Sequence, residues 1–270
     1  MKGVVLIAVL AAGPVLAAPP CKTAITCFDQ GLRLELGPAR DDAGAAKAYA
    51  RACKLGSGMG CTMLSKLQEK GERAKSVARA AEIFRRECEA GDARGCFQLG
   101  YSVKEDKPAA QAAHRRAVEL FAVGCAAGQA EECDMQAKVL RDGKILEADE
   151  AAADAADARS VPGRTAACEA GDLDACVDLA IHYRDGKGVG RDLTRSRVLF
   201  ERSCATRPTD CLHVAQHYYR GTGGVAEDGA RATELFARAC DARNIFACEF
   251  LEMACQNKDF PSCKREKDDP

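Results

Sequence analysis

The sequence contains no tryptophan, and only five tyrosines and nine phenylalanines among 270 residues. Aromatic side chains supply much of the buried area of a large core, so their scarcity favours many small interfaces over one bulky core. Neither sign of charge is in clear excess, since the formal net charge of the chain is −1. The chain therefore lacks the basic footprint typical of proteins that bind nucleic acid or anionic membranes, and we expect neither as a partner.

Long hydrophobic runs are missing apart from a short one at the N-terminus. Lys2 precedes an apolar stretch over residues 4–12, and residues 15–17 (VLA) resemble a signal-peptidase site. Gly13 and Pro14 interrupt the run well short of the roughly 18 apolar residues that a membrane-spanning helix needs. The sequence thus predicts a cleaved signal peptide at residues 1–18, an exported periplasmic or secreted chain, and no membrane span in the mature protein.

Cysteine, in contrast, is abundant: there are sixteen, an even number, and none lies in the predicted signal. In an oxidising compartment such cysteines form disulfides. Structural zinc sites use shorter spacings, of two to four residues. The chain also has no C-x-x-C pair of the kind used in redox catalysis. We therefore expect disulfides, no metal and no cofactor.

The cysteines reveal an internal repeat. The first cysteine of each pair recurs at intervals of 35, 37, 43, 36 and 36 residues: Cys53, Cys88, Cys125, Cys168, Cys204 and Cys240. The second follows after seven residues, or after six in one case: Cys61, Cys96, Cys133, Cys176, Cys211 and Cys248. A period of this size is the signature of a repeat architecture.

Other positions keep the same register. A ring lies four residues before the first cysteine, at Tyr49, Phe84, Phe121, Phe200 and Phe236, with Arg164 as the exception. Apolar residues at helical spacing lead up to the first cysteine, and a second helical pattern follows the second cysteine and stops near a glycine ten residues on. Each unit is therefore a predicted helix-loop-helix pair. Because one pair cannot bury its apolar stripe alone, neighbouring pairs must stack into a solenoid.

Geometry restricts how the cysteines pair. Eight residues along one helix span about 12 Å, whereas a disulfide needs Cα atoms roughly 4.4–6.8 Å apart. Cysteines of one pair can bond only if the chain reverses between them, as a glycine three residues after the first would allow; Cys248 and Cys255, on one helix, cannot bond. The predicted disulfides are Cys21–Cys27, Cys53–Cys61, Cys88–Cys96, Cys125–Cys133, Cys168–Cys176, Cys204–Cys211, Cys240–Cys248 and Cys255–Cys263.

Residues 160–192 resemble the Sel-like repeat family, which is related to tetratricopeptide repeats. The resemblance is carried, in order, by a small residue, A-C, Gly, C, Leu, Tyr, G-x-G-V and Asp. The C-x7-C pairs resemble its cysteine-rich, secreted bacterial branch, the Hcp type. The likeness runs from Cys21 to about Cys263 and is weakest over residues 134–165, where Arg164 replaces the ring. It implies an all-α, right-handed superhelical solenoid of six to seven disulfide-clipped repeats. It also implies either an adaptor for proteins or, as in the Hcp branch, penicillin binding with weak β-lactamase activity.

The expected organisation is a signal at 1–18, a single solenoid over 19–264 and a charged tail at 265–270. Residues 147–159 are acidic and rich in alanine. We interpret them as a solvated helix or an extended loop, with a functional acidic patch as the alternative.

No catalytic residue is predicted. A serine β-lactamase carries S-x-x-K, S-D-N and K-T-G, and all three are absent. His213 and His217 are spaced to share one helix face, and His217 has the same repeat position as His182. They are open to three interpretations: a structural role, contact with a ligand, or a metal site without a third ligand nearby. The glycine segments 186–190 and 221–225 recur between helices and are predicted to be turns, not phosphate loops.

Binding has the better physical basis. Stacked helix pairs present a long concave face suited to a peptide or protein segment, lined by the helices that begin at the second cysteines. We predict that its exposed polar residues contact a partner: Gln98, Asp178, His182, His213 and His217. The leading hypothesis is an exported adaptor or scaffold. The alternatives are a weak β-lactamase that takes β-lactams or cell-wall fragments, and a secreted factor acting on a host or neighbouring cell.

Overall fold

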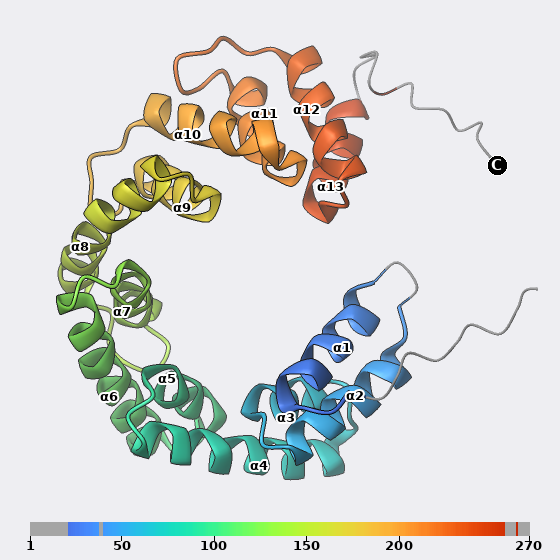
Figure 1. Cartoon of the computed structure of the whole chain (residues 1–270), viewed down its shortest axis with the longest axis vertical. Coiled ribbons are helices and arrows are strands. Elements are labelled where there is room, and N and C mark those ends of the chain that lie inside the picture. Colours follow the sequence, from blue (N-terminus) through green and yellow to red (C-terminus); the bar gives the residue numbers. More distant parts are fainter. Residues whose placement is uncertain (1–20, 38–39, 257–262, 264–270) are drawn as a thin grey trace, which may run out of the picture. The chain divides into compact units, whose positions relative to one another are not determined.

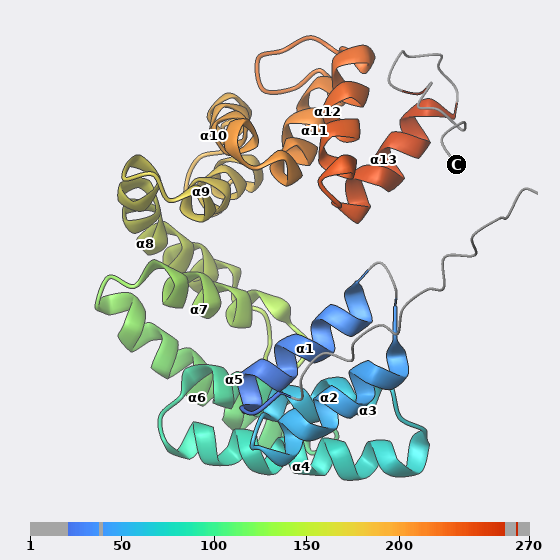
Figure 2. The same cartoon turned by 45° about the vertical axis from the view of Figure 1, so that its right-hand side comes forward.

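The computed structural model describes residues 21–37, 40–256 and 263. These residues form thirteen α-helices and one 3-10 helix and contain no strand, which confirms the predicted all-α fold of tandem helices (Figures 1 and 2). None of the described helices is long and apolar enough to span a bilayer. The predicted signal at 1–18 and tail at 265–270 lie outside the described residues.

The chain divides between Phe84 and Arg85 into two compact units. The first unit contains α1 (Ala24–Leu36), α2 (Asp42–Lys54), α3 (Gly58–Lys66) and most of α4 (Lys70–Glu89). In its core the Tyr49 ring is fully buried against Gly31, and its hydroxyl donates to Glu35 at 2.6 Å.

One predicted helix end in this unit is wrong. The helix that follows Cys61 was expected to continue to Gly71, but α3 ends at Lys66 and Gly71 lies inside α4. The Arg73 side chain of α4 donates to the backbone carbonyls of Ser65 and Gln68. These bonds satisfy carbonyls at the end of α3 that would otherwise lack a partner.

The second unit continues from the end of α4 with helices that each pack on the next. They are α5 (Ala93–Ser102), α6 (Lys107–Ala126), α7 (Ala130–Asp142), α8 (Glu150–Glu169), α9 (Leu173–Asp185), α10 (Leu193–Thr206), η1 (Pro208–Asp210), α11 (Cys211–Arg220), α12 (Gly229–Asp241) and α13 (Ile245–Cys255). In Figure 1, α5, α7 and α9 lie along one side of this row and α6 and α8 along the other. The predicted stacking of helix pairs is therefore seen within this unit.

Aspartates start most of the helices that lead up to the first cysteine of a pair. Their carboxylates accept the backbone N–H three residues on, which satisfies a donor at the helix start. The residues concerned are Asp41, Asp106, Asp149, Asp192 and Asp228. Residues 150–159 of the acidic stretch form the first half of α8, which Asp149 caps. This part is therefore helical, but it is not fully solvated, because Ala153, Ala156 and Asp157 are buried.

The structure joins all sixteen cysteines in the eight pairs that the spacing predicts, with Cα atoms 4.4–5.5 Å apart. Most pairs clip the end of one helix to the start of the next. The chain reverses there through a left-handed residue, which is a glycine in four turns: Gly56, Gly91, Gly128 and Gly171. In the Cys240–Cys248 turn the same position is Arg243, at φ 68°. A side chain is unfavourable in that conformation.

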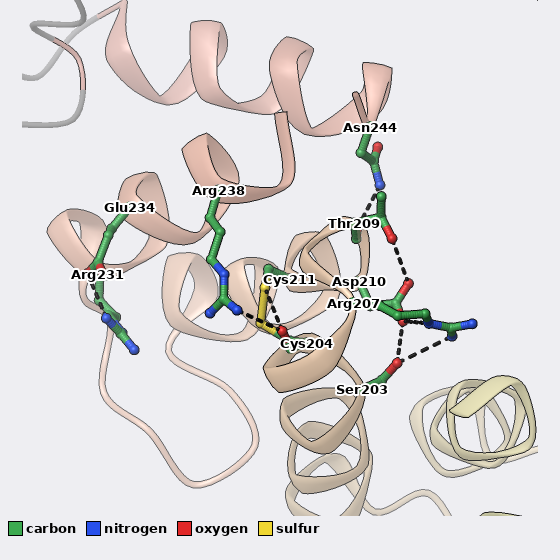
Figure 3. Close-up of a disulfide and its surroundings, with 10 residues drawn as sticks. All are labelled: Ser203, Cys204, Arg207, Thr209, Asp210, Cys211, Arg231, Glu234, Arg238 and Asn244. Carbon is green, nitrogen blue, oxygen red and sulfur yellow. Dashed lines mark hydrogen bonds and ion pairs between the residues drawn. A yellow bond between two sulfur atoms is a disulfide. The ribbon is translucent and has the colours of Figure 1, made fainter. Parts of the chain in front are cut away.

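The shorter Cys204–Cys211 turn is built differently (Figure 3). It contains η1 in place of a left-handed glycine, and Asp210 accepts hydrogen bonds from Ser203 and from Arg207 Nε, the latter at 2.8 Å. Asn244 of the next turn donates to the Thr209 carbonyl at 2.9 Å. Side-chain contacts thus hold a reversal that a glycine makes elsewhere.

Candidate functional site

The residue four positions before the first cysteine of a pair lies in the core of each repeat. Its rings are at most 3% exposed: Tyr49, Phe84, Phe121, Phe200 and Phe236. In α8 the same position holds Arg164, whose side chain is 17% exposed. One repeat therefore has a cation where the others have an aromatic ring, and burial of a charge requires partners.

Arg164 finds those partners on both neighbouring helices. Its Nε and Nη2 lie 3.0 Å and 2.6 Å from Oδ2 of Asp134 on α7. Its Nη1 lies 2.8 Å from Oδ2 of Asp178 on α9. The guanidinium thus bridges α7 and α9 from the helix between them.

His182 of α9 extends this network. Its Nδ1 lies 2.8 Å from the carbonyl oxygen of Lys187, to which it must donate. Its Nε2 lies 3.3 Å from Asp134 Oδ1 and 3.3 Å from Ser160 Oγ. Ser160 donates its proton to the Asp157 carbonyl at 2.8 Å, so a neutral Nε2 would present a lone pair to a carboxylate. Protonation of Nε2 removes that repulsion.

The pKa values of the two groups reflect this pairing. Burial opposes the imidazolium, but the Asp134 carboxylate and the Lys187 carbonyl outweigh it and raise the pKa of His182. Burial likewise opposes the carboxylate form of Asp134, yet His182 and Arg164 together lower its pKa. Each of the two groups therefore favours the charged form of the other. Asp134 Oδ1 is buried, and His182 Nε2 faces it at 3.3 Å.

Arg141 anchors the other side of the site. Its Nη2 lies 2.8 Å from both Asp157 and Asp154, and its Nε lies 2.9 Å from Glu150. All three acids belong to α8, so Arg141 ties the end of α7 to that helix. Asp157 is only 3% exposed, and this guanidinium compensates its charge.

A cavity of about 400 Å³ opens onto this network between α7, α8 and α9. Asp134, Lys138, Arg141, Asp142, Asp157, Asp178, Ile181, His182 and Lys187 line it. Lys138 makes no ion pair with the described residues, and its Nζ lies over the Phe97 ring at 5.8 Å. Asp178 is 40% exposed, and burial together with nearby Asp134 raises its pKa. The cavity thus presents charges of both signs to a ligand.

The network does not fit a metal ion. Asp134, Asp157 and His182 each offer one atom, all within 4.8 Å of one another. However, Arg164 and Arg141 are already paired with the two carboxylates. The His182 nitrogen that faces them is favoured in its protonated form, which cannot ligate a metal. A divalent cation would have to displace three positive groups.

The network does not fit a catalytic triad either. In such a triad, different imidazole nitrogens contact the serine and the carboxylate. Here Nε2 faces both Ser160 and Asp134, while Nδ1 is bound to a backbone carbonyl. The Ser160 side chain is also fully buried. The arrangement holds charges in place and does not activate a nucleophile.

The structure brings together only some of the predicted contact residues. Asp178 and His182 share this cavity, whereas His213 and His217 lie at another cavity beside α11. Gln98 is half-buried in α5 and lines neither of them. Asp134, Arg141, Asp157 and Ser160 were not predicted, and the missing ring at Arg164 was the one signal that pointed to them.

The expected exposure of His182 and His217 is wrong. Both are at most 6% exposed because each fastens the glycine loop that follows its helix. His182 bonds the Lys187 carbonyl, and His217 Nδ1 lies 3.1 Å from the Thr222 hydroxyl. The loops therefore cover a position that helix phase alone places at the surface.

The Sel1 repeat model matches residues 173–205 and 210–244, two segments in which α9 is followed by α10 and α11 by α12. Comparison with curated proteins gives no match.

Solved structures that are similar to the chain include the following three. A protective antigen of uropathogenic Escherichia coli with an SLR fold is 16% identical at a TM-score of 0.38; the match covers 89% of this chain but only 58% of the antigen. A Sel1 repeat protein of Oxalobacter formigenes is 18% identical over 90% of this chain and 99% of its own, at a TM-score of 0.43. A putative Sel1 repeat protein of Klebsiella pneumoniae is 16% identical over 77% of this chain and 98% of its own, at a TM-score of 0.39.

Proposed function

We propose that this protein is an exported Sel-like repeat protein of the cysteine-rich Hcp type. In this proposal it binds a protein or peptide segment and serves as an adaptor or scaffold. The contact site is the cavity between α7, α8 and α9, and Asp178 and His182 are the predicted contact residues that belong to it.

The replacement of the core ring by Arg164 carries the proposal. A buried ion-pair network is usually no more stabilising than well-packed apolar residues of similar volume. The other repeats hold the same position with a ring, so stability alone gives no reason for the change. Buried charged groups that line a cavity are typical of binding sites.

The charges of the cavity define what it binds. Asp178 is partly exposed and can accept a hydrogen bond from a lysine or arginine side chain of a partner. Lys138 at the rim makes no ion pair with the described residues and can bind an acidic group. We therefore propose a partner segment with a basic residue that enters the cavity and an acidic residue beside it.

The compartment belongs to the same proposal. Eight disulfides are typical of an oxidising environment outside the cytoplasm. The signal at 1–18 would direct export, residues 19–264 would act as one solenoid, and the acidic and basic residues at 265–270 would form a tail.

A peptide selection tests the binding site. Oxidised protein is used to select binders from a phage-displayed random peptide library, and the enriched peptides are then measured against two variants. D178K reverses a charge in the cavity, and E105K makes the same charge change at an exposed residue before α6. We expect enriched peptides with a basic residue, loss of binding to D178K and unchanged binding to E105K. Equal binding to both variants would refute the site.

A further inference from the structure

A second cavity of about 120 Å³ lies between α9, α10 and α11. Its lining contains no carboxylate. Three arginines and two histidines line it: Arg184, Arg191, Arg220, His213 and His217. The small volume restricts a ligand to one compact group. The composition of the wall favours a negative one.

The positive charge of this cavity is only partly neutralised. Arg184 pairs with Asp185, and Arg191 Nε donates to the Arg184 carbonyl at 3.0 Å. The Arg220 side chain makes no hydrogen bond or ion pair with the part of the chain that the structure describes. Of the three guanidiniums only that of Arg184 is paired with a carboxylate, and Lys187 also binds this carboxylate.

The nearby acids on neighbouring elements are already paired. Glu201 of α10 is bound by Arg197 at 2.5 Å. Asp210 of η1 is bound by Arg207 at 2.8 Å. Neither leaves a free carboxylate to balance the arginines of the cavity.

His213 supplies the second observation. Its ring stacks on Phe200, with centroids 4.4 Å apart, and its Nδ1 is buried without a hydrogen-bond partner among the described residues. A buried polar atom in that state needs a partner. Burial and the nearby arginines lower the pKa of both His213 and His217, as expected where positive charge is not balanced.

We propose that this cavity is a binding site for a single oxyanion group, a phosphate or a carboxylate, held by Arg184, Arg191 and Arg220. Guanidinium groups bind such oxyanions through paired, charge-assisted hydrogen bonds. His213 and His217 form the wall against which the anion lies. The site is separate from the cavity at Asp134 and does not depend on the proposed function.

The test uses the full oxidised protein with ¹⁵N-labelled histidine. Inorganic phosphate and acetate are titrated separately, with sodium chloride adjusted to hold the ionic strength constant. We expect the His213 and His217 resonances to shift saturably and their pKa values to rise, because a bound anion stabilises the imidazolium. His114 and His182, away from this cavity, report non-specific effects.

Two variants complete the test. R220Q removes the unpaired guanidinium and should weaken anion binding about tenfold. R231Q removes an exposed arginine of α12 that pairs with Glu234 and should leave binding unchanged. Tighter binding of phosphate than of acetate would identify a phosphate-type ligand, and the reverse a carboxylate; both support the site. Shifts no larger than those with chloride, or equal binding by R220Q, would overturn it.

Discussion

Nη2 of Arg164 lies 2.6 Å from Oδ2 of Asp134, at the repeat position where the neighbouring units bury an aromatic ring. The two residues are 30 positions apart and belong to different helices. Their ion pair replaces part of the apolar contact between α7 and α8. It also explains why the Asp134 carboxylate stays ionised although it is largely buried.

Truncation of Arg164 should destabilise the protein strongly. R164A leaves Asp134 without its main cation, and breaking a buried pair in this way costs about 3–5 kcal/mol. Denaturant unfolding of the oxidised protein measures the loss. R115A, at an exposed arginine of α6, is the control and should unfold like wild type. Restoring the apolar pair with R164F and D134V together should recover most of the stability, and equal unfolding of R164A and wild type would contradict the account.

The pKa values of the two repeated histidines, His182 and His217, should be shifted in opposite directions. His182 faces Asp134, whereas His217 has Val177 at the equivalent repeat position and no acid in its place. NMR titration should place the pKa of His182 above about 6.5 and that of His217 below it. D134N should lower the pKa of His182 and leave that of His217 unchanged. An unchanged His182 pKa in D134N would exclude the ion pair.

These two pKa shifts make the stability of the fold depend on pH in opposite ways. The raised pKa of His182 stabilises the fold fully below about pH 6.5, and this contribution is lost as pH rises through its folded pKa. The lowered pKa of His217 stabilises the fold above about pH 6.5, and this is lost as pH falls through its folded pKa. In D134N the loss of stability on the alkaline side of the His182 titration should disappear.

Introducing a glycine at a left-handed position of a clip turn and removing one should change the stability in opposite directions. R243G relieves a left-handed side-chain residue at φ 68° and should stabilise by about 0.5–1 kcal/mol. G171A introduces the same strain at φ 101° and should destabilise by about 1 kcal/mol, although a Cβ there meets no other atom. G190A, in open space without a positive φ, is the control. Equal thermal midpoints for all three variants would refute the conformational argument.

The period of the cysteines predicts most of the fold because each unit solves the same local problem. A ring, a small residue and a reversing glycine recur with most pairs of cysteines, and these contacts are short in sequence. The site could not be predicted in this way, since Asp134, Arg164 and Asp178 meet from three consecutive helices. Only the exception at Arg164 marked the place. Helix phase also failed for His182, because the loop at Lys187 folds back over it.

Removal of one disulfide should weaken the fold locally. C125A together with C133A opens a loop of about eight residues, and the chain-entropy model gives a loss of about 2–3 kcal/mol. Reduction of all eight disulfides should lower the thermal midpoint much further and reduce helical content. Thermal unfolding followed by circular dichroism measures both. A reduced protein that melts at the oxidised temperature would show that the clips do not stabilise the helices.

Site-specific photo-crosslinking in the producing cell tests the proposed contact site most directly. A photoreactive residue at Lys138 lies at the rim of the α7–α9 cavity, and one at Val123, 69% exposed on α6, is the matched control. The account predicts a discrete light-dependent adduct with a partner protein from position 138 and none from position 123. Adducts from both positions alike, or from position 123 alone, would contradict it.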